Sequence, residues 1–400
     1  MNGFCLGKSF NSFLHNIEIV DFFLLFISFL LCFSLGSSWT GLSGGQLVAI
    51  RLIIVSFLIL LFLYKIRFKV ISASFLPIAT FSFFVIFRGV LSVISPGNAI
   101  LQGSLYLLLF LNLFYFQDKY TVEDLIFTLF VIVSLVVFIV DIFIITTGGR
   151  GFLYRTSAYV FSSNFILGDK FTISYLHMLF CSLALVVLRN SVLTFILFIV
   201  SFLICQLVGC ATGIFGLFLI ILFVFMIKIF RRTFLNRFSA LIIIYSMAII
   251  SLIASTFFSL PFVELFITEI LHRSADMTGR LAIYPHLIPL FLKQPLFGYG
   301  SNGAANYAVT TVLSAPNAQQ GLFHILLSFG LVGVFLFTYC IQFYLQFLDR
   351  IEDKYFSIYA FICAMSVISL VEINIDCLFF IAIFLIYLLS SSNEDLTRDV

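Results

Sequence analysis

Long runs of apolar residues, each closed by a short polar break, follow one another along this chain. A helix crosses the apolar core of a bilayer with roughly 20 such residues, so these runs predict about twelve membrane spans. The expected spans cover residues 20–37, 47–64, 70–87, 99–116, 125–146, 170–188, 191–208, 211–227, 238–256, 322–347, 356–373 and 377–391. Because backbone polar groups in lipid must bond within their own segment, the expected fold class is all-α, a polytopic membrane helix bundle.

The composition agrees with this membrane class. The 400 residues are 62% hydrophobic and only 10% charged, whereas soluble domains carry about 25% charged residues. The eight cysteines lie mostly within the apolar runs, and neither a CxxC pair nor a Cys/His spacing suited to zinc occurs. We therefore expect buried, apolar thiols, no metal site and no cofactor.

The positions of the basic residues orient the spans. The clusters KIRFK (65–69) and KIFRR (228–232) fall on the same side of the membrane once the spans are drawn. Because connections in the cytoplasm are enriched in Lys and Arg, this side is assigned to the cytoplasm. Both chain termini are then expected to be cytoplasmic.

Two connections on the opposite, outer side are long, at about 147–169 and 257–321. We divide the chain accordingly into a bundle of nine spans (1–256), a large outer loop (257–321), and three final spans with a cytoplasmic C-terminus (322–400). Within the large loop, the apolar segment 281–293 is too short to span the membrane and contains two prolines. It predicts a short helix that lies along the membrane surface.

These two loops concentrate arginine on the side where basic residues are disfavoured. Arg150 and Arg155 lie in the first loop, and Arg273 and Arg280 in the second. The guanidinium fork matches the oxygens of a phosphate or carboxylate. The arginines therefore indicate either binding of a lipid-linked phosphate or pyrophosphate, or pairing with acidic residues and lipid headgroups.

Charged residues within the spans need partners, since an isolated charge in lipid is costly. Asp141 and Arg51 are the clearest cases, and we expect them to face the bundle interior, where they pair with each other or line a groove for a lipid substrate. Glu372 and Asp376, near an outer end, are expected to reach the interface.

The large loop also carries a recognisable string of motifs. TGR (278–280) is followed by Tyr284, by QPLFGYGSN (294–302) and by GLVG (330–333), which opens onto the apolar run VFLFTYCIQF. This order resembles the O-antigen polymerase and ligase family, in which a "GR … W … PLLGxG" string precedes a span that opens with "GLxG". The segment RGFLYRTSAYVFSSNFILG (150–168) is similar to the first arginine-bearing loop of that family.

The resemblance implies a GT-C-like glycosyltransferase that acts at the periplasmic face of the bacterial inner membrane. Donor and acceptor would both be glycans on undecaprenyl pyrophosphate, with membrane lipids and a chain-length regulator protein as further partners and no nucleic acid. Arg280 would stabilise the leaving pyrophosphate without a metal ion, and the glycines of 298–303 would let the chain turn tightly. His324 and Asp276 are the first candidates for the base, ahead of Glu269 and His286. The expected substrate-binding residues are Arg150, Arg155, Arg273, Tyr284, Gly298, Gly300 and Asn302.

Two departures from the family pattern favour a polymerase over a ligase. A His-Asn pair that is common in the ligases is replaced here by Gln319 and Gln320, and CATG (210–213) lacks the arginine of the family's Ser-Arg-Thr. The alternatives are an O-antigen ligase, which transfers glycan to lipid A-core, a flippase or transporter for the lipid-linked unit, and a non-catalytic scaffold. Transporters usually place their charges near the membrane midplane, whereas the charges here lie in outer loops.

Overall fold

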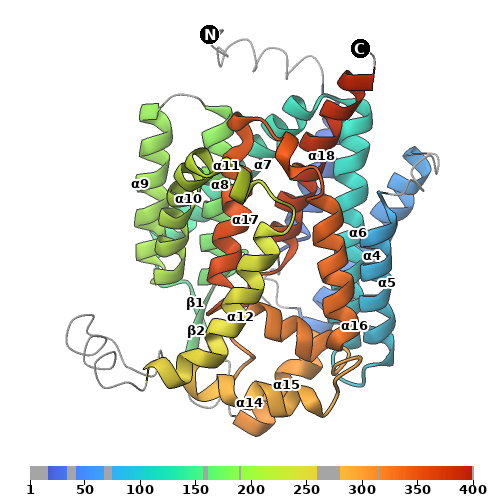
Figure 1. The fold of residues 1–400 in the computed structure, drawn as a ribbon, viewed down its shortest axis with the longest axis vertical. Helices are drawn as coiled ribbons and strands as arrows, with labels where there is room; N and C mark the ends of the chain where they lie inside the picture. The colour runs from blue at the N-terminus through green and yellow to red at the C-terminus, as the bar shows by residue number, and fades with distance from the viewer. Residues whose placement is uncertain are drawn as a thin grey trace.

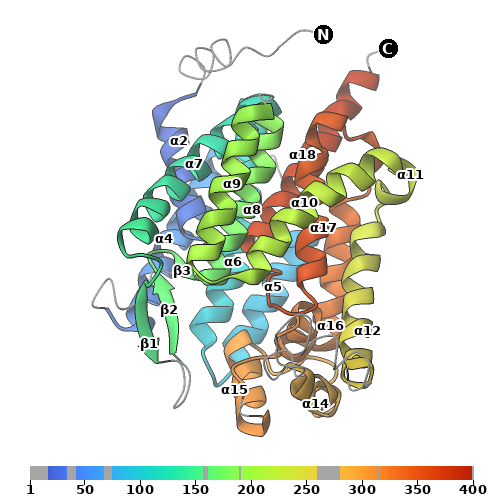
Figure 2. The same cartoon turned by 90° about the vertical axis from the view of Figure 1, so that its left-hand side faces the viewer.

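The computed structural model describes residues 17–33, 42–66, 74–155, 161–188, 191–258, 280–313 and 315–398. They form a bundle of helices that run roughly along one axis (Figure 1). α2 begins and α18 ends at the same end of this bundle, which we call the inner end (Figures 1 and 2). The short elements α14 and α15 lie at the opposite, outer end.

A helix occupies the position of every predicted span, which confirms the all-α membrane fold. Six of the described helices are long and apolar enough to cross a membrane, and shorter apolar helices accompany them. The span helices are α2 (Ile19–Leu30), α4 (Gly44–Lys65), α5 (Leu76–Leu91), α6 (Pro96–Lys119), α7 (Val122–Thr146), α8 (Lys170–Val187), α9 (Ser191–Leu207), α10 (Ala211–Ile229), α12 (Ser239–Phe258), α16 (Gly321–Tyr344), α17 (Phe356–Ile368) and α18 (Cys377–Arg398). Between them lie α11 (Arg231–Phe234), α14 (Arg280–Leu292), α15 (Asn302–Leu313), and the 3-10 turns Leu348–Arg350 and Asp353–Tyr355.

Polar side chains fix where several of these helices begin. Ser43 and Gln46 form a capping box at the start of α4, in which each side chain bonds to the backbone N–H of the other. Thr121 accepts a hydrogen bond from the N–H of Asp124 in α7, and Asp169 accepts one from that of Thr172 in α8. Each cap satisfies an N–H group that the first helical turn leaves without a partner.

The core of the bundle lies where α6, α16 and α18 meet. Aromatic rings fill this contact: Tyr106 and Phe380 are 4.5 Å apart between ring centroids, and Phe110 and Phe384 are 5.4 Å apart. In contrast, α4 and α9 leave large apolar side chains such as Phe57 and Phe195 exposed. Apolar side chains on the outward face of a helix suit contact with lipid, because the lipid chains are also apolar.

A buried carboxylate ties three helices together at the inner end. Asp21 of α2 is fully buried and accepts hydrogen bonds from Lys65 (3.0 Å), Lys119 (2.7 Å), Tyr115 (3.1 Å) and Tyr120 (2.8 Å). These partners belong to α4 and α6 or follow directly on α6. Four donors around one carboxylate offset its loss of hydration, so Asp21 is part of the packing of this end.

Replacing Asp21 by alanine should lower the melting temperature of the detergent-purified protein. Lys65 would lose its carboxylate partner and Lys119 would keep only Glu18, while the two lysines remain about 26% and 33% exposed. We expect a loss of about 2–3 kcal/mol, somewhat below the value for a fully buried pair. Asp353→Asn is the matched control, because it removes an exposed ion pair with Arg231 that contributes about 0–1 kcal/mol. Equal melting temperatures for the two variants would contradict this role of Asp21.

The first outer loop contains a small antiparallel sheet that the sequence did not predict. Its strands, in the order β1-β2-β3, are β1 (Phe152–Arg155), β2 (Phe161–Phe165) and β3 (Gly168–Asp169). Phe152 pairs with Asn164, and Asn164 also pairs with Asp169. The chain passes directly from β3 into α8, so the sheet fixes where the first residues of that helix lie.

Asp141 is paired inside the bundle, but the prediction that its partner is Arg51 is wrong. The carboxylate of Asp141 lies 3.0 Å from Nε2 of His177, and Nδ1 of the same ring lies 3.0 Å from the hydroxyl of Ser201. These hydrogen bonds join α7, α8 and α9. Arg51 instead donates to the carbonyl of Leu31, because α4 packs against α6 whereas α7 packs against α8.

Candidate functional site

A break in α16 organises the outer end of the bundle. Gly330 has φ +67° and ψ −166°, so the helix divides there into two segments. Such a break leaves backbone groups on both sides without their usual helical partners. The turn that contains QPLFGYGSN supplies these partners.

Four backbone hydrogen bonds join this turn to the break. The N–H groups of Tyr299 and Gly300 donate to the carbonyls of Leu327 and Ser328, both at 2.8 Å. In the other direction, Leu331 donates to Pro295 at 2.9 Å and Val332 donates to Leu296 at 3.1 Å. The two strings that carry the family resemblance, PLFGYG and GLVG, therefore form a single unit, which we call the motif junction (295–300 with 327–332).

Two features of the turn explain its composition. Gly298 has φ +61°, and a Cβ atom there would lie 2.5 Å from the carbonyl oxygen of Leu327. Only glycine fits this close approach. Arg88 of α5 then donates from Nε to the carbonyl of Phe297 and from Nη2 to that of Gly298, each at 3.1 Å. Nothing in the sequence singled out Arg88 for this role, because its partner segment lies about two hundred residues away along the chain.

The start of α16 forms a second polar region next to the motif junction. Gln320 caps the helix by accepting from the N–H of Phe323 at 2.6 Å, and Gly321 donates to the carbonyl of Ser369 at 2.8 Å. His324, one helical turn further, is only 5% exposed. Its Nδ1 atom and Nε2 of Gln320 are both buried without a hydrogen-bond partner in the structure. Such atoms are costly in a finished core and are compatible with a ligand that completes their bonding.

Tyr284 is enclosed rather than open to a ligand. Its ring is 1% exposed, and its hydroxyl donates to the carbonyls of Leu370 at 2.9 Å and Gln319 at 3.3 Å. The residue thereby holds α14 against the start of α16 and the end of α17. Any part that Tyr284 has in substrate binding is thus indirect, through the position of these segments.

Of the other predicted site residues, those that the structure describes lie at the outer end. Asn302 begins α15 and donates from Nδ2 to Oε1 of Gln102 at 2.9 Å, while Gly300 has φ +97° and lies against the backbone of Arg88. Arg150 is exposed after α7, and His286 is exposed on α14. Arg280 begins α14 and Arg155 ends β1, but their side chains are outside the described part of the structure. Arg273, Asp276 and Glu269 lie wholly outside the described residues.

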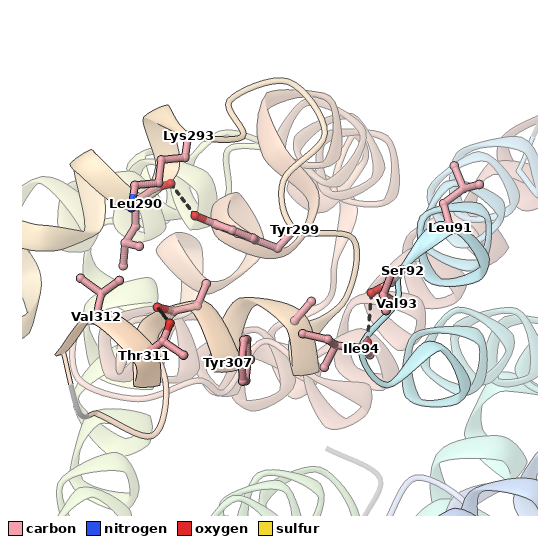
Figure 3. Close-up of a pocket in the computed structure, with 12 residues that line it drawn as sticks. Leu91, Ser92, Val93, Ile94, Leu290, Lys293, Tyr299, Tyr307, Thr311 and Val312 are labelled. Atoms are coloured by element: carbon pink, nitrogen blue, oxygen red, sulfur yellow. Dashed lines mark hydrogen bonds between the residues drawn. The ribbon is translucent and has the colours of Figure 1, made fainter.

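A cavity of about 480 Å³ opens beside the motif junction (Figure 3). It lies between the connection from α5 to α6, the end of α14, the turn and α15. Its walls are mainly apolar, with Lys293 as the one basic lining residue, and Tyr299 crosses it to donate to the carbonyl of Leu290 at 3.0 Å. Tyr307, also in the wall, is exposed. A cavity of this kind suits a molecule with an apolar part and an anionic group.

We find no group of three His, Cys, Asp or Glu side chains that could hold a metal ion within the described ranges. The prediction that the arginines bind phosphate stays a prediction for the side chains outside these ranges.

Comparison with known proteins gives one match. Residues 177–338 match a family model described as O-antigen ligase. This segment runs from α8 to the inner half of α16 and includes the whole motif junction, the cavity-lining part of α14 and all of α15. Neither a curated protein nor a solved structure matches the chain. The match supports the resemblance seen in the motifs: residues 177–338 are similar to the O-antigen ligase family.

Proposed function

We propose that this protein is a polysaccharide polymerase of the O-antigen type. It joins oligosaccharide repeat units carried on undecaprenyl pyrophosphate by glycosyl transfer at the periplasmic face of a bacterial inner membrane. The observation that supports this most directly is the motif junction: two strings separated by about thirty residues meet at the outer end, directly after the end of α14 (Arg280–Leu292). Both termini are then cytoplasmic, and a chain-length regulator is a natural partner.

The chemistry requires stabilisation of a leaving group more than its protonation. The acceptor hydroxyl oxygen attacks the anomeric carbon of the donor, and the bond from that carbon to the pyrophosphate oxygen breaks. The pyrophosphate keeps the electron pair, and fixed guanidinium groups lower the energy of its developing charge. Arg280 has this role in our proposal, with Arg150, Arg155 and Arg273 binding the phosphates.

A base must take the proton of the attacking hydroxyl. The candidates for this base from the sequence are His324 and Asp276. His324 lies at the start of α16, and its Nδ1 atom has no hydrogen-bond partner in the structure. The apolar cavity beside Lys293 offers space for part of the lipid-linked substrate at the outer end.

An O-antigen ligase is the second candidate, because the matching family model carries that description. In that case the acceptor is lipid A-core rather than a second lipid-linked unit. Gln319 and Gln320 stand where the family's ligases commonly have His and Asn, and Gln320 serves here as a helix cap. This use of the position supports the polymerase over the ligase.

Deletion of the gene, followed by electrophoresis of the surface polysaccharide, separates these functions. Loss of a polymerase should leave single repeat units attached to the core, because ligation and translocation of the unit continue. Loss of a ligase or a flippase should leave bare core. A plasmid copy of the wild-type gene should restore long chains. Bare core in the deletion strain would contradict the polymerase.

A further inference from the structure

The cavity between the end of α14 and α15 carries a positive charge that no acidic residue of its wall neutralises. Lys293 is its basic lining residue, and neither aspartate nor glutamate lines it. Lys293 is exposed, and it forms no ion pair with any carboxylate in the described part of the chain. Its ammonium group is therefore available to an anion that enters the cavity.

Two hydrogen bonds hold the backbone of Lys293 at the edge of this cavity. The carbonyl of Leu290 accepts one from the N–H of Lys293 at 3.3 Å and another from the hydroxyl of Tyr299 at 3.0 Å. Figure 3 shows Tyr299 pointing from the turn toward Leu290. Since the N–H of Tyr299 bonds to α16 within the motif junction, the end of α14 is fixed relative to that junction.

The walls of the cavity suit an apolar chain. Apolar side chains come from the connection between α5 and α6, from α14 and from α15, and Leu91, Val93 and Val312 among them are exposed. Exposed apolar surface of this kind marks contact with a ligand or with lipid. The volume of about 480 Å³ lies within the range of about 300–1,000 Å³ that is usual for ligand sites. An apolar chain with an anionic head next to Lys293 matches both the walls and the charge.

Lys293 and Arg280 lie at opposite ends of α14. The helix has 13 residues, from Arg280 to Leu292, and Lys293 follows it directly. At about 1.5 Å of rise per residue, the backbones of the two basic residues are roughly 20 Å apart. A pyrophosphate group is much shorter than this separation. The two positions therefore suit the anionic groups of two different molecules.

We propose that this cavity binds the lipid carrier of the acceptor, with Lys293 paired to its phosphate and the apolar walls around the first isoprenoid units. The inference rests on the proposed function, in which a donor and an acceptor, both carried on undecaprenyl pyrophosphate, are held at the same time. Arg280 serves the donor, whose pyrophosphate leaves. The acceptor keeps its pyrophosphate, so its site needs a cation that binds charge, for which one lysine is sufficient. No bond is made or broken at Lys293.

The first test counts the carriers that the detergent-purified protein binds. Undecaprenyl pyrophosphate is added in steps, and the complexes are resolved by native mass spectrometry. We expect wild type to bind two carriers and Ala308→Phe to bind one, because the new ring would occupy the cavity that Ala308 lines. Two carriers on Ala308→Phe, or only one on wild type, would overturn the proposal.

Phosphatidylglycerol in the same experiment distinguishes the carrier from an ordinary phospholipid. It also has an anionic head and apolar chains, but it lacks the pyrophosphate and the isoprenoid chain. At equal concentration it should leave the second carrier bound. Displacement of that carrier would identify a membrane phospholipid as the occupant and would overturn the proposal.

Lys293→Gln tests the charge and leaves the cavity in place. We expect the second carrier to bind about tenfold more weakly, as for the loss of a hydrogen bond to a charged group. Long-chain polysaccharide should fall in a deletion strain that carries this variant. Lys293→Arg, which keeps the charge, should retain most of the binding. Unchanged binding of the second carrier by Lys293→Gln would remove Lys293 from the site, including the case in which Ala308→Phe does not accumulate.

The matched control is Lys170→Gln. Lys170 begins α8, also at the outer end, and donates from Nζ to the carbonyl of Gly209 at 3.4 Å. Its replacement removes the same charge from the same end of the bundle, and it should leave both carriers bound and the chains long. Equal losses in Lys170→Gln and Lys293→Gln would mean that the total charge of the outer end, and not this cavity, governs binding.

These outcomes are separate from those that test the proposed function. Bare core in the deletion strain contradicts the polymerase, whatever number of carriers the purified protein binds. Single repeat units in the deletion strain, together with wild-type chains in both Ala308→Phe and Lys293→Gln, would leave the polymerase standing and remove the acceptor site.

Discussion

Arg280→Ala is expected to abolish long polysaccharide chains while the protein accumulates in the membrane at its normal level. Arg280 begins α14, two positions after the start of the TGR motif and close along the chain to the proposed site at the outer end. In our proposal its guanidinium meets the charge that develops on the leaving pyrophosphate. Loss of one such group typically costs about 10²–10³-fold in rate. The measurement is the chain-length distribution on a gel, with an immunoblot of the membrane fraction.

The matched control for Arg280 is Arg237→Ala, at the inner end. Arg237 is exposed and stacks over Phe238, with 4.7 Å from its guanidinium carbon to the ring centroid. Its removal takes the same charge from the protein and should leave chain lengths unchanged. Wild-type chains in Arg280→Ala would remove this arginine from the site, and equal losses in both variants would point to a general effect of charge.

Gly298→Ala should strongly destabilise the outer end. A left-handed φ costs a non-glycine residue roughly 1–2 kcal/mol, and the new methyl group would also meet the backbone of α16. It would lie 2.5 Å from the carbonyl oxygen of Leu327 and 2.6 Å from the nitrogen of Gly330. We expect a total loss of about 3–5 kcal/mol, with a lower melting temperature in detergent and loss of chain extension.

Gly148→Ala separates the two parts of this effect. Gly148 has φ +59°, almost the same as Gly298, but a Cβ atom there would have no neighbour within 4 Å. The control therefore carries the backbone strain without the steric overlap, and it should lose only about 1–2 kcal/mol. If both variants had the same melting temperature, the contact between the turn and α16 would not matter for stability.

The spans were predictable because their signal is local. Each apolar run is long enough to identify a helix by itself, and α4, α7 and α10 lie within a few residues of the predicted positions. The prolines of 281–293 likewise did not hide the helix α14 (Arg280–Leu292), since the apolar run was still visible. In such segments the backbone must form its hydrogen bonds within the helix, because lipid offers none, so distant contacts have little effect on the secondary structure.

The features that the sequence did not reveal depend on distant pairing. Asp141 found His177 rather than Arg51, because the choice depends on which helices are neighbours. The sheet β1-β2-β3 has strands of two to five residues, too short to stand out in an aromatic-rich loop. The motif junction was visible as two separate strings, but nothing in them showed that they bond to each other. Arg88 gave no signal for the same reason.

The carboxylate of Asp21 also bears on how the chain is made. Its lysine partners follow it by 44 and 98 residues, so both are synthesised after α2. Until α4 arrives, α2 holds a carboxylate in its first turn with no cation beside it. The bonding of Asp21 is therefore complete only when the end of α6 has been synthesised.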